Sequence, residues 1–428
     1  MKKCLIVILS IFAIVACDNY EENEFTPSLI EENVAIEDSF YVPYETALMY
    51  ATQALEVDGD ETRGVKSVRN VASHYEYTIG NSTRAAAENK EVKFHIINFE
   101  NNEGFAIIAA DSRTVPVYAF SLEGNIDMNR TIDNPGFKYF LESAVEYYEK
   151  DLNIDFPPLI PDTSDIPFLA LEEIDGKLCH MRREISYITN PLGVLLNVNW
   201  NQDFPYNYYC GENSHTGIQY GYRNAAGCGP IAASQIMSYY RHPSSFDGYT
   251  IEWDAIMSSA YYNERYSENT ECSYNAKCLA RLINLVGIES YANYGSQTGV
   301  YIDDVDDMFR TFGYNCSDPT AFSSSLVRAS INEGEPVFAG GISQNGGGHA
   351  WVIDGYKQQI VNVTYYYRTP PYNIYKKNVE YGAYYYHCNW GWGEDSNSNV
   401  WCLDVFSPYA GTNYNTNNQI IYNIKPIN

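Results

Sequence analysis

The sequence predicts an α+β protein, because its helix-forming and strand-forming segments are grouped instead of alternating. Helical periodicity is concentrated between residues 230 and 312, and strand patterns follow from residue 336 onward. A separate group of helices and strands precedes residue 150. The 428 residues are enough for two domains. We therefore expect a small N-terminal α+β module, followed by a larger domain with a helical half and an antiparallel sheet half.

The first 17 residues predict export. Met1-Lys2-Lys3 is a short basic segment, and the apolar run from Cys4 to Ala16 has the length of a signal-peptide core but is short for a membrane span. The run ends in Ile14-Val15-Ala16-Cys17, which resembles the lipobox of bacterial lipoproteins. We expect a signal peptide at 1–17 and a lipid on Cys17 that anchors the protein to the outer membrane or cell surface. The alternative is an ordinary secretory signal cut nearby.

Composition excludes some functions. A net charge of −27 and a pI near 4.5 argue against nucleic-acid binding, which needs a basic face. Ten cysteines are present, but none of them has the spacing of a zinc site. We expect no metal and no organic cofactor, and we interpret most cysteines as small buried hydrophobic residues.

The N-terminal module, residues 18–150, begins with a predicted helix from Glu45 to Leu55. A hairpin follows, in which alternating residues from Val92 to Ile96 precede a turn at 101–104 and a returning strand at 105–109. Asn134-Pro135-Gly136 begins an amphipathic helix that continues to Tyr148. The module offers no candidate nucleophile.

Residues 151–190 are predicted to be a linker, because prolines and charges replace the periodic patterns. Met181-Arg182-Arg183 lies within this segment, and exposed dibasic sequences are easily cut, so an activation cleavage is expected here. A plain tether between domains is the alternative.

The second domain, residues 191–428, begins with three predicted helices, at Pro230–Tyr240, Asn275–Val286 and Asp303–Phe312. Strands are predicted from residue 336 to residue 405. Its predicted strands are Pro336–Ala339, Ala350–Ile353, two tyrosine-rich runs at 363–367 and 381–387, and Val400–Val405.

One cysteine lies where a nucleophile is expected. Cys228 directly precedes the helix that begins near Pro230, and Gly227 and Gly229 leave its thiol uncrowded. A helix N-terminus and an imidazolium partner together lower a cysteine pKa from ~8.5 to roughly 3.5–7.5. We therefore expect Cys228 to be a nucleophile, and the alternative is a structural cysteine at the start of a core helix.

His349 is the expected partner of that thiol. Three glycines precede it, which allows a substrate chain to pass closely, and the strand Ala350–Ile353 follows it. Among the seven histidines, His387 is the main competitor, because it lies near Asn389. Asn389 is predicted to accept the imidazole N–H, with neighbouring indoles excluding water. The alternatives are a core histidine and a tight turn with packed indoles.

Several motifs resemble those of the streptopain family, the papain-fold cysteine peptidases that bacteria make as inhibited zymogens. Cysteine, histidine and asparagine follow one another in the order of papain-like thiol hydrolases. Gly104–Asp111, followed by Arg113, is similar to the family's inhibitory prodomain. The motifs of the catalytic part are Phe204–Asn207, Gly227-Cys228, Gln235-Ile236-Met237, Gly347–Ala350, Val352–Gly355 and Asn389–Gly393. The resemblance implies a papain-like catalytic domain at 191–428 and an inhibitory prodomain at 18–150, with protein or peptide substrates.

The resemblance also implies roles for single residues. Cys228 would be the nucleophile, with its backbone N–H in the oxyanion hole, and His349 would be the general base and acid. Asn389 and Trp390 would orient and cover the histidine. The remaining site residues would support the loop or line the substrate groove: Trp392, Gly348 and Val300.

Two features depart from the family pattern. Val300 stands where the family can carry a small polar residue, so the subsite preference stays open. The connection between His349 and Asn389 is long, and we interpret residues 357–386 as an added β-hairpin beside the cleft, either functional or decorative. A thiol acyltransferase on the same fold and a non-catalytic surface-binding lipoprotein are the alternative functions.

Overall fold

The computed structural model describes residues 40–55, 69–78, 92–130, 132–152, 170–174, 177–267, 271–342, 348–367, 374–394, 398–406 and 418–427. The predicted signal peptide and the lipidation site Cys17 lie outside these residues. Within the described part of the chain, no helix is long and apolar enough to cross a membrane.

The N-terminal module is an antiparallel sheet with two helices, and its predicted helices and hairpin are confirmed. Asn134 caps the second helix by accepting hydrogen bonds from the backbone N–H groups of Gly136 and Phe137, at 3.0 and 3.1 Å. Its elements are α1 (Tyr44–Leu55), β1 (Val71–Thr78), β2 (Val92–Phe99), the 3-10 turn η1 (Glu100–Asn102), β3 (Phe105–Ala109), β4 (Val117–Ser121) and α2 (Pro135–Asp151).

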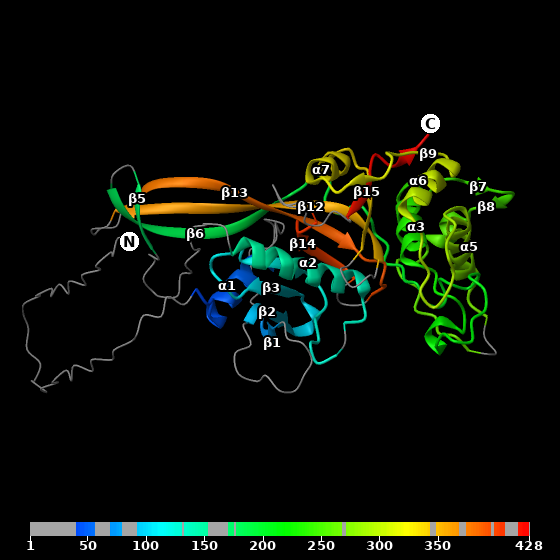
Figure 1. Cartoon of the computed structure of the whole chain (residues 1–428), viewed down its shortest axis with the longest axis horizontal. Coiled ribbons are helices and arrows are strands. Elements are labelled where there is room, and N and C mark those ends of the chain that lie inside the picture. The colour runs from blue at the N-terminus through cyan, green and yellow to red at the C-terminus, as the bar shows by residue number, and fades with distance from the viewer. Residues whose placement is uncertain are drawn as a thin grey trace, which may run out of the picture. The chain divides into compact units, whose positions relative to one another are not determined.

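The second domain begins with the predicted helices, which Figure 1 shows grouped together. Helix α3 contacts α5 and the strand β12, so the helical half is packed against the sheet half. The helices are α3 (Cys228–Tyr240), α4 (Trp253–Ile256), α5 (Tyr274–Glu289), α6 (Ile302–Thr311) and α7 (Ser324–Asn332), with the 3-10 turn η2 (Ile218–Tyr220) before them. Short strands lie between them, namely β7 (Ser245–Phe246), β8 (Tyr249–Thr250), β9 (Tyr314–Asn315) and β10 (Thr320–Ala321), and β16 (Lys425–Pro426) near the C-terminus pairs with β9.

A single antiparallel sheet runs through both parts of the chain, in the order β1-β2-β3-β4-β14-β13-β12-β11-β15-β10. The junction is the pairing of β4 with β14, where Phe120 faces Trp401 and Ala119 faces Cys402. The predicted α+β class is thereby confirmed, with the module's strands continuing the sheet of the second domain. The long strands are β11 (Val337–Ile342), β12 (Gly348–Tyr367), β13 (Ile374–Asn389), β14 (Asn399–Leu403) and β15 (Gln419–Ile421).

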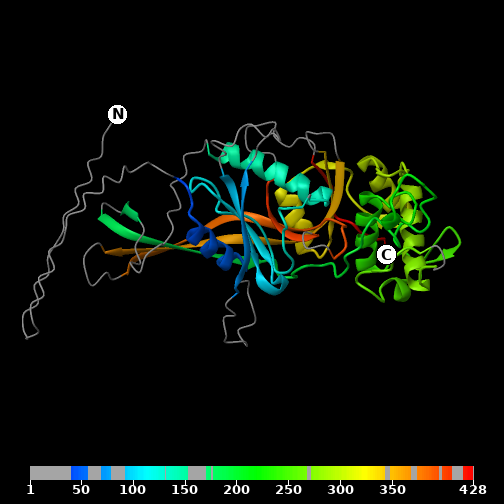
Figure 2. The ribbon, with the colours of Figure 1, turned by 90° about the horizontal axis from the view of Figure 1, so that it is seen from below.

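The predicted hairpin at 357–386 is present, as the continuation of β12 and β13. The segment 151–190 differs from a plain linker, because it contains β5 (Ala170–Ile174) and β6 (Lys177–Thr189). Strand β6 pairs with β12 along its length, β5 pairs with the first residues of β6, and Figures 1 and 2 show β6 running beside β12 and β13. The β12 strand of the long hairpin has an edge whose backbone N–H and C=O groups need hydrogen-bond partners. Strand β6 of the 151–190 segment supplies them. The sequence did not indicate this pairing, because the two strands are far apart along the chain.

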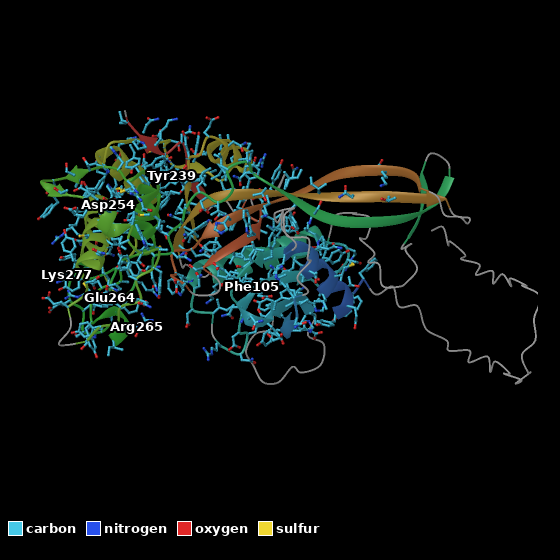
Figure 3. The ribbon with its side chains drawn as sticks, turned by 180° about the vertical axis from the view of Figure 1, so that it is seen from behind. Phe105, Tyr239, Asp254, Glu264, Arg265 and Lys277 are labelled. Atoms are coloured by element: carbon cyan, nitrogen blue, oxygen red, sulfur yellow. The ribbon has the colours of Figure 1, made fainter. Side chains whose placement is uncertain are left out.

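The described residues form two hydrophobic cores. One joins the module to the sheet half and contains Phe105, which Figure 3 labels within the module. The other lies among the helices and under β12. At the junction the ring of Phe120, 0% exposed, has its centroid 5.2 Å from that of Tyr187 and 5.8 Å from that of Tyr385. The module is therefore bound by both backbone pairing and aromatic packing.

Candidate active site

Cys228 is the first residue of α3, as the sequence predicted. The preceding Gly227 has a positive φ of 93°, and a Cβ there would lie 2.8 Å from the side chain of Thr298, so glycine is required. Thr298 also donates from Oγ1 to the carbonyl of Ala225, at 2.7 Å. These contacts fix the turn that places the sulfur at a helix N-terminus.

The pKa of the Cys228 thiol is raised by burial, although the backbone N–H groups of Ala350, Gly229 and Cys228 itself act to lower it. This direction differs from the lowered pKa that we expected. The contact with Ala350 is informative, because that residue directly follows His349. The structure therefore brings Cys228 to the strand of the predicted base, and in this form the sulfur is a thiol with no imidazolium to offset its burial.

His349 lies at the start of β12 and is 4% exposed. Its Nε2 is 2.9 Å from the carbonyl oxygen of Trp390. A carbonyl can only accept, so Nε2 carries the hydrogen and Nδ1 keeps the lone pair. Burial lowers the pKa of His349 to about 4, so the ring is neutral at physiological pH.

Asn389 does not have the contact that we expected, since among the described residues its side chain has no hydrogen bond to His349. Its Oδ1 accepts from Nε2 of Gln235, at 3.2 Å, and from the N–H of Gly391, at 3.1 Å. Its Nδ2 donates to the carbonyl of Val198, at 2.8 Å. Both lone pairs of Oδ1 are thereby engaged. The carbonyl of Trp390 orients the histidine instead.

The other predicted site residues lie around these groups. The Trp390 ring is fully buried, with its centroid 6.2 Å from that of the His349 ring. Val300 reaches the start of α3, since a Cβ on Gly229 would lie 2.3 Å from its Cγ2. Gly348 is exposed beside His349, and the backbone of Trp392 donates to Oγ of Ser398, at 3.3 Å.

The N-terminal module covers this site. A Cβ on Gly136, in the first turn of α2, would lie 2.5 Å from Cδ2 of His349 and 2.5 Å from Cε3 of Trp390. One turn later, the hydroxyl of Tyr139 donates a hydrogen bond to Oδ1 of Asn418. Burial raises the pKa of Tyr139 to about 12. Helix α2 therefore packs against the His349 imidazole, and only glycine fits at position 136.

Gln202 lies beside the nucleophile loop and has no motif that marks it in the sequence. Its carbonyl accepts from the N–H of Ala226, at 2.9 Å, which ties it to the loop that carries Cys228. Within the described residues, its side-chain amide has no hydrogen-bond partner. An amide beside the nucleophile loop is a candidate oxyanion donor. Only its position near the resembling segment Phe204–Asn207 could have pointed to it.

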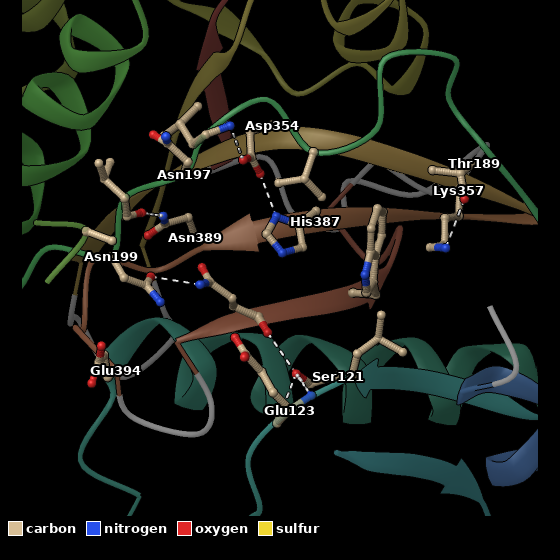
Figure 4. Close-up of a pocket in the computed structure, with 17 residues that line it drawn as sticks. Ser121, Glu123, Thr189, Asn197, Asn199, Asp354, Lys357, His387, Asn389 and Glu394 are labelled. Atoms are coloured by element: carbon tan, nitrogen blue, oxygen red, sulfur yellow. Dashed lines mark hydrogen bonds and ion pairs between the residues drawn. The ribbon is translucent and has the colours of Figure 1, made fainter. Parts of the chain in front are cut away.

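His387, the competing histidine, belongs to a different place. Its Nδ1 is 2.6 Å from Oδ1 of Asp354, which is 0% exposed. Both line a cavity of about 700 Å³ between the module and the second domain, shown in Figure 4. The second oxygen of Asp354 accepts from the N–H of Leu196, at 3.0 Å. This pair holds the start of the second domain onto the sheet.

Two segments of the chain match known protein families. Residues 200–399 match the model of the peptidase C10 family, and residues 40–148 match that of the Spi protease inhibitor. The thiol protease/hemagglutinin PrtT of Porphyromonas gingivalis is 22% identical over 85% of this chain, although the match spans 42% of PrtT. Streptopain of Streptococcus pyogenes is 25% identical over 72% of this chain and 73% of its own length. The fold is shared with a prointerpain A fragment of Prevotella intermedia, with a TM-score of 0.51, 19% identity and coverage of 78% of this chain and 96% of that chain.

Proposed function

We propose that this chain, which joins a catalytic domain of the peptidase C10 family to a domain of the Spi protease inhibitor family, is the zymogen of a cysteine endopeptidase. One observation carries the proposal. The thiol of Cys228 at the start of α3 lies against the N–H of Ala350, the residue after His349, and this contact supports a pairing of the thiol with the imidazole. No nucleic acid is proposed as a partner, since the net charge is −27.

In the active form, Nδ1 of His349 takes the proton of the Cys228 thiol, and the thiolate attacks the carbonyl carbon of a peptide bond. The tetrahedral oxyanion is stabilised by the N–H of Cys228, with the amide of Gln202 as the second donor. His349 then returns the proton to the leaving amine, which leaves a thioester on Cys228. Water, deprotonated by His349, hydrolyses the thioester and restores the thiol.

In the latent form the N-terminal module is the inhibitor. Helix α2 occupies the space over His349 and Trp390, so a peptide cannot approach the imidazole. Burial under this helix keeps the imidazole neutral, which removes the cation that would stabilise a thiolate on Cys228. Activation then requires cleavage between the module and the catalytic domain, followed by release of α2.

We also propose that the protein is exported and held by a lipid on Cys17, on the support of the lipobox-like sequence Ile14–Cys17. After cleavage between the module and the catalytic domain, dissociation of the two would leave the module on the membrane and release the catalytic domain. Cys17→Ala is expected to abolish metabolic labelling with palmitate and to move the uncut protein into the soluble fraction. Unchanged labelling would rule out this anchor.

The activity is tested with Cys228→Ala in the full-length protein. We expect loss of casein hydrolysis and of self-processing, while wild type gives two fragments. Cys316→Ala is the matched control, because Cys316 is a partly buried thiol whose Sγ is 3.7 Å from the carbonyl oxygen of Asp306, in a different part of the domain. Full casein hydrolysis by Cys228→Ala would overturn the proposal. Transfer of a labelled amine in preference to water would indicate an acyltransferase.

A further inference from the structure

We propose that Gln235 is a positioning residue, which fixes the acceptor of the His349 imidazole relative to the helix of the nucleophile. The inference rests on the proposed peptidase function. Gln235 lies in α3 about two turns after Cys228, so both side chains project from the same side of the helix. It is 0% exposed, and a fully buried amide is costly unless both of its ends are hydrogen-bonded.

Both ends of this amide are in fact engaged. Oε1 accepts from the backbone N–H of Trp200, at 3.1 Å, and Nε2 donates to Oδ1 of Asn389, at 3.2 Å. The N–H of Trp200 can only donate, so the oxygen of Gln235 must face it and the nitrogen must face Asn389. The side chain therefore connects three segments that are distant in sequence.

Asn389 transmits this connection to the loop after β13. Its Oδ1 also accepts from the N–H of Gly391, at 3.1 Å, so hydrogen bonds hold the residues on both sides of Trp390. The carbonyl of Trp390 is the acceptor that orients His349. Displacing the amide pair would move that carbonyl, and the imidazole with it.

Close packing of the loop on α3 is an independent observation. Gly391 has a positive φ of 66°, and a Cβ there would lie 2.9 Å from Cγ2 of Ile231 and 3.9 Å from Nε2 of Gln235. The loop backbone thus touches the nucleophile helix, at the level of Gln235, and leaves no room for a side chain. A displacement of the Gln235 side chain would therefore move the backbone of this loop.

The test uses Gln235→Met, which keeps the volume and removes both hydrogen bonds, and Gln235→Glu. Each full-length variant is processed by a trace of tagged wild-type enzyme, which is then removed. We expect Gln235→Met to lower kcat roughly 10- to 100-fold with KM within about twofold, because a misplaced base reduces the chemical step. The apparent pKa of Cys228, measured by iodoacetamide labelling against pH, should rise in this variant.

Gln235→Glu distinguishes positioning from packing. A carboxylate can accept from Trp200 but cannot donate to Asn389, whereas the protonated acid can do both. The ratio of its kcat/KM to that of wild type should therefore be highest at acid pH and fall as pH rises. A ratio that stays constant across pH, together with an unchanged thiol pKa in Gln235→Met, would overturn the inference.

Ser330→Ala is the matched control, because the buried Ser330 hydroxyl in α7 also makes two hydrogen bonds, to the carbonyl of Glu335 and from the N–H of Asn423. It should lower the melting temperature but leave kcat and its pH profile unchanged. A control with the same loss of kcat would also contradict the inference. Failure of the proposed function looks different, since processed wild type would then lack Cys228-dependent hydrolysis.

Discussion

At the scale of single residues, latency depends on contacts too specific for a sequence pattern to reveal. The sequence pointed to Cys228 and His349 by their surroundings, and the structure places the thiol of Cys228 against the backbone N–H of Ala350, the residue after His349. The sequence did not reveal that the backbone carbonyl of Trp390 would orient His349, because every residue has a carbonyl and none is marked by its residue type. Asn389 was assigned that role by its residue type, yet its oxygen is engaged elsewhere.

Gly136 offers a direct test of latency at this scale. Gly136→Val would place a branched side chain where a single Cβ already lies 2.5 Å from the His349 ring. Overpacking of this kind costs about 1–3 kcal/mol, so the docking of α2 should weaken by that amount. We expect the uncut zymogen to hydrolyse a small peptide substrate faster than wild type does.

The control for that variant is Lys138→Val, which puts the same side chain on the exposed face of the same helix. It should change helix stability slightly without raising the activity of the uncut protein. Equal activity of Gly136→Val and wild type, with Cys228 equally slow to react with iodoacetamide, would show that α2 does not hold the imidazole.

At the scale of elements, periodicity predicted most helices and strands, because each of them buries one face in its own module. The predicted helices at 230–240, 275–286 and 303–312 correspond to α3, α5 and α6. Strand β6 is the exception. Its partner β12 begins well over a hundred residues later, and pairing with a distant edge leaves no local signal. A charged, proline-flanked segment was therefore interpreted as a linker.

The pairing of β6 predicts slow cleavage at the dibasic sequence. In register, Arg182 faces Thr364 and Arg183 faces Val363, so the backbone must leave the sheet before a protease can bind it. Asn362→Pro removes a ladder hydrogen bond in the central strand β12 and should open this region, since a proline cannot donate to either neighbouring strand. In the Cys228→Ala zymogen, we expect trypsin to cut after Arg183 at least about tenfold faster in this variant.

Tyr249→Pro in the two-stranded sheet of β7 and β8 is the control, because it disturbs a strand that does not contact β6. Mass spectrometry of the early fragments separates cleavage after Arg183 from cleavage elsewhere. If both variants and the parent were cut there at the same rate, the pairing of β6 with β12 would not protect the site.

At the scale of the whole molecule, the sequence predicted the α+β class and the order of inhibitor and catalytic parts, which depend on patterns within each part. It did not predict that β4 and β14 would join the two parts in one sheet. That junction involves strand edges, and edges pair through backbone groups that every residue possesses. Cutting the chain therefore leaves the module bound through Phe120 and its neighbours, and release needs a further cause.

Acid pH is one such cause of release. The direction of the effect follows from the lowered pKa of His349. In the docked form burial lowers the pKa of His349 to about 4, whereas an exposed histidine has a pKa near ~6.5. As pH falls from about 6.5 toward 4, the released form takes up a proton that the docked form does not. Docking should therefore weaken by up to about tenfold per pH unit over that range, and be fully restored above it. Burial also lowers the pKa of His74 and His95 within the module, so its own folding follows the same direction.

The contribution of His349 is isolated in a Cys228→Ala background, nicked by a trace of wild-type enzyme. Dissociation of the module is measured by size-exclusion chromatography between pH 4.5 and 7.5. Adding His349→Gln removes the titrating group. The affinity of the module for the catalytic domain should therefore fall less steeply with acidification in the double variant, and the difference between the two slopes is the contribution of His349. Parallel slopes for the two proteins would assign the acid response to the module's own histidines, and the imidazole under α2 would then have no part in release.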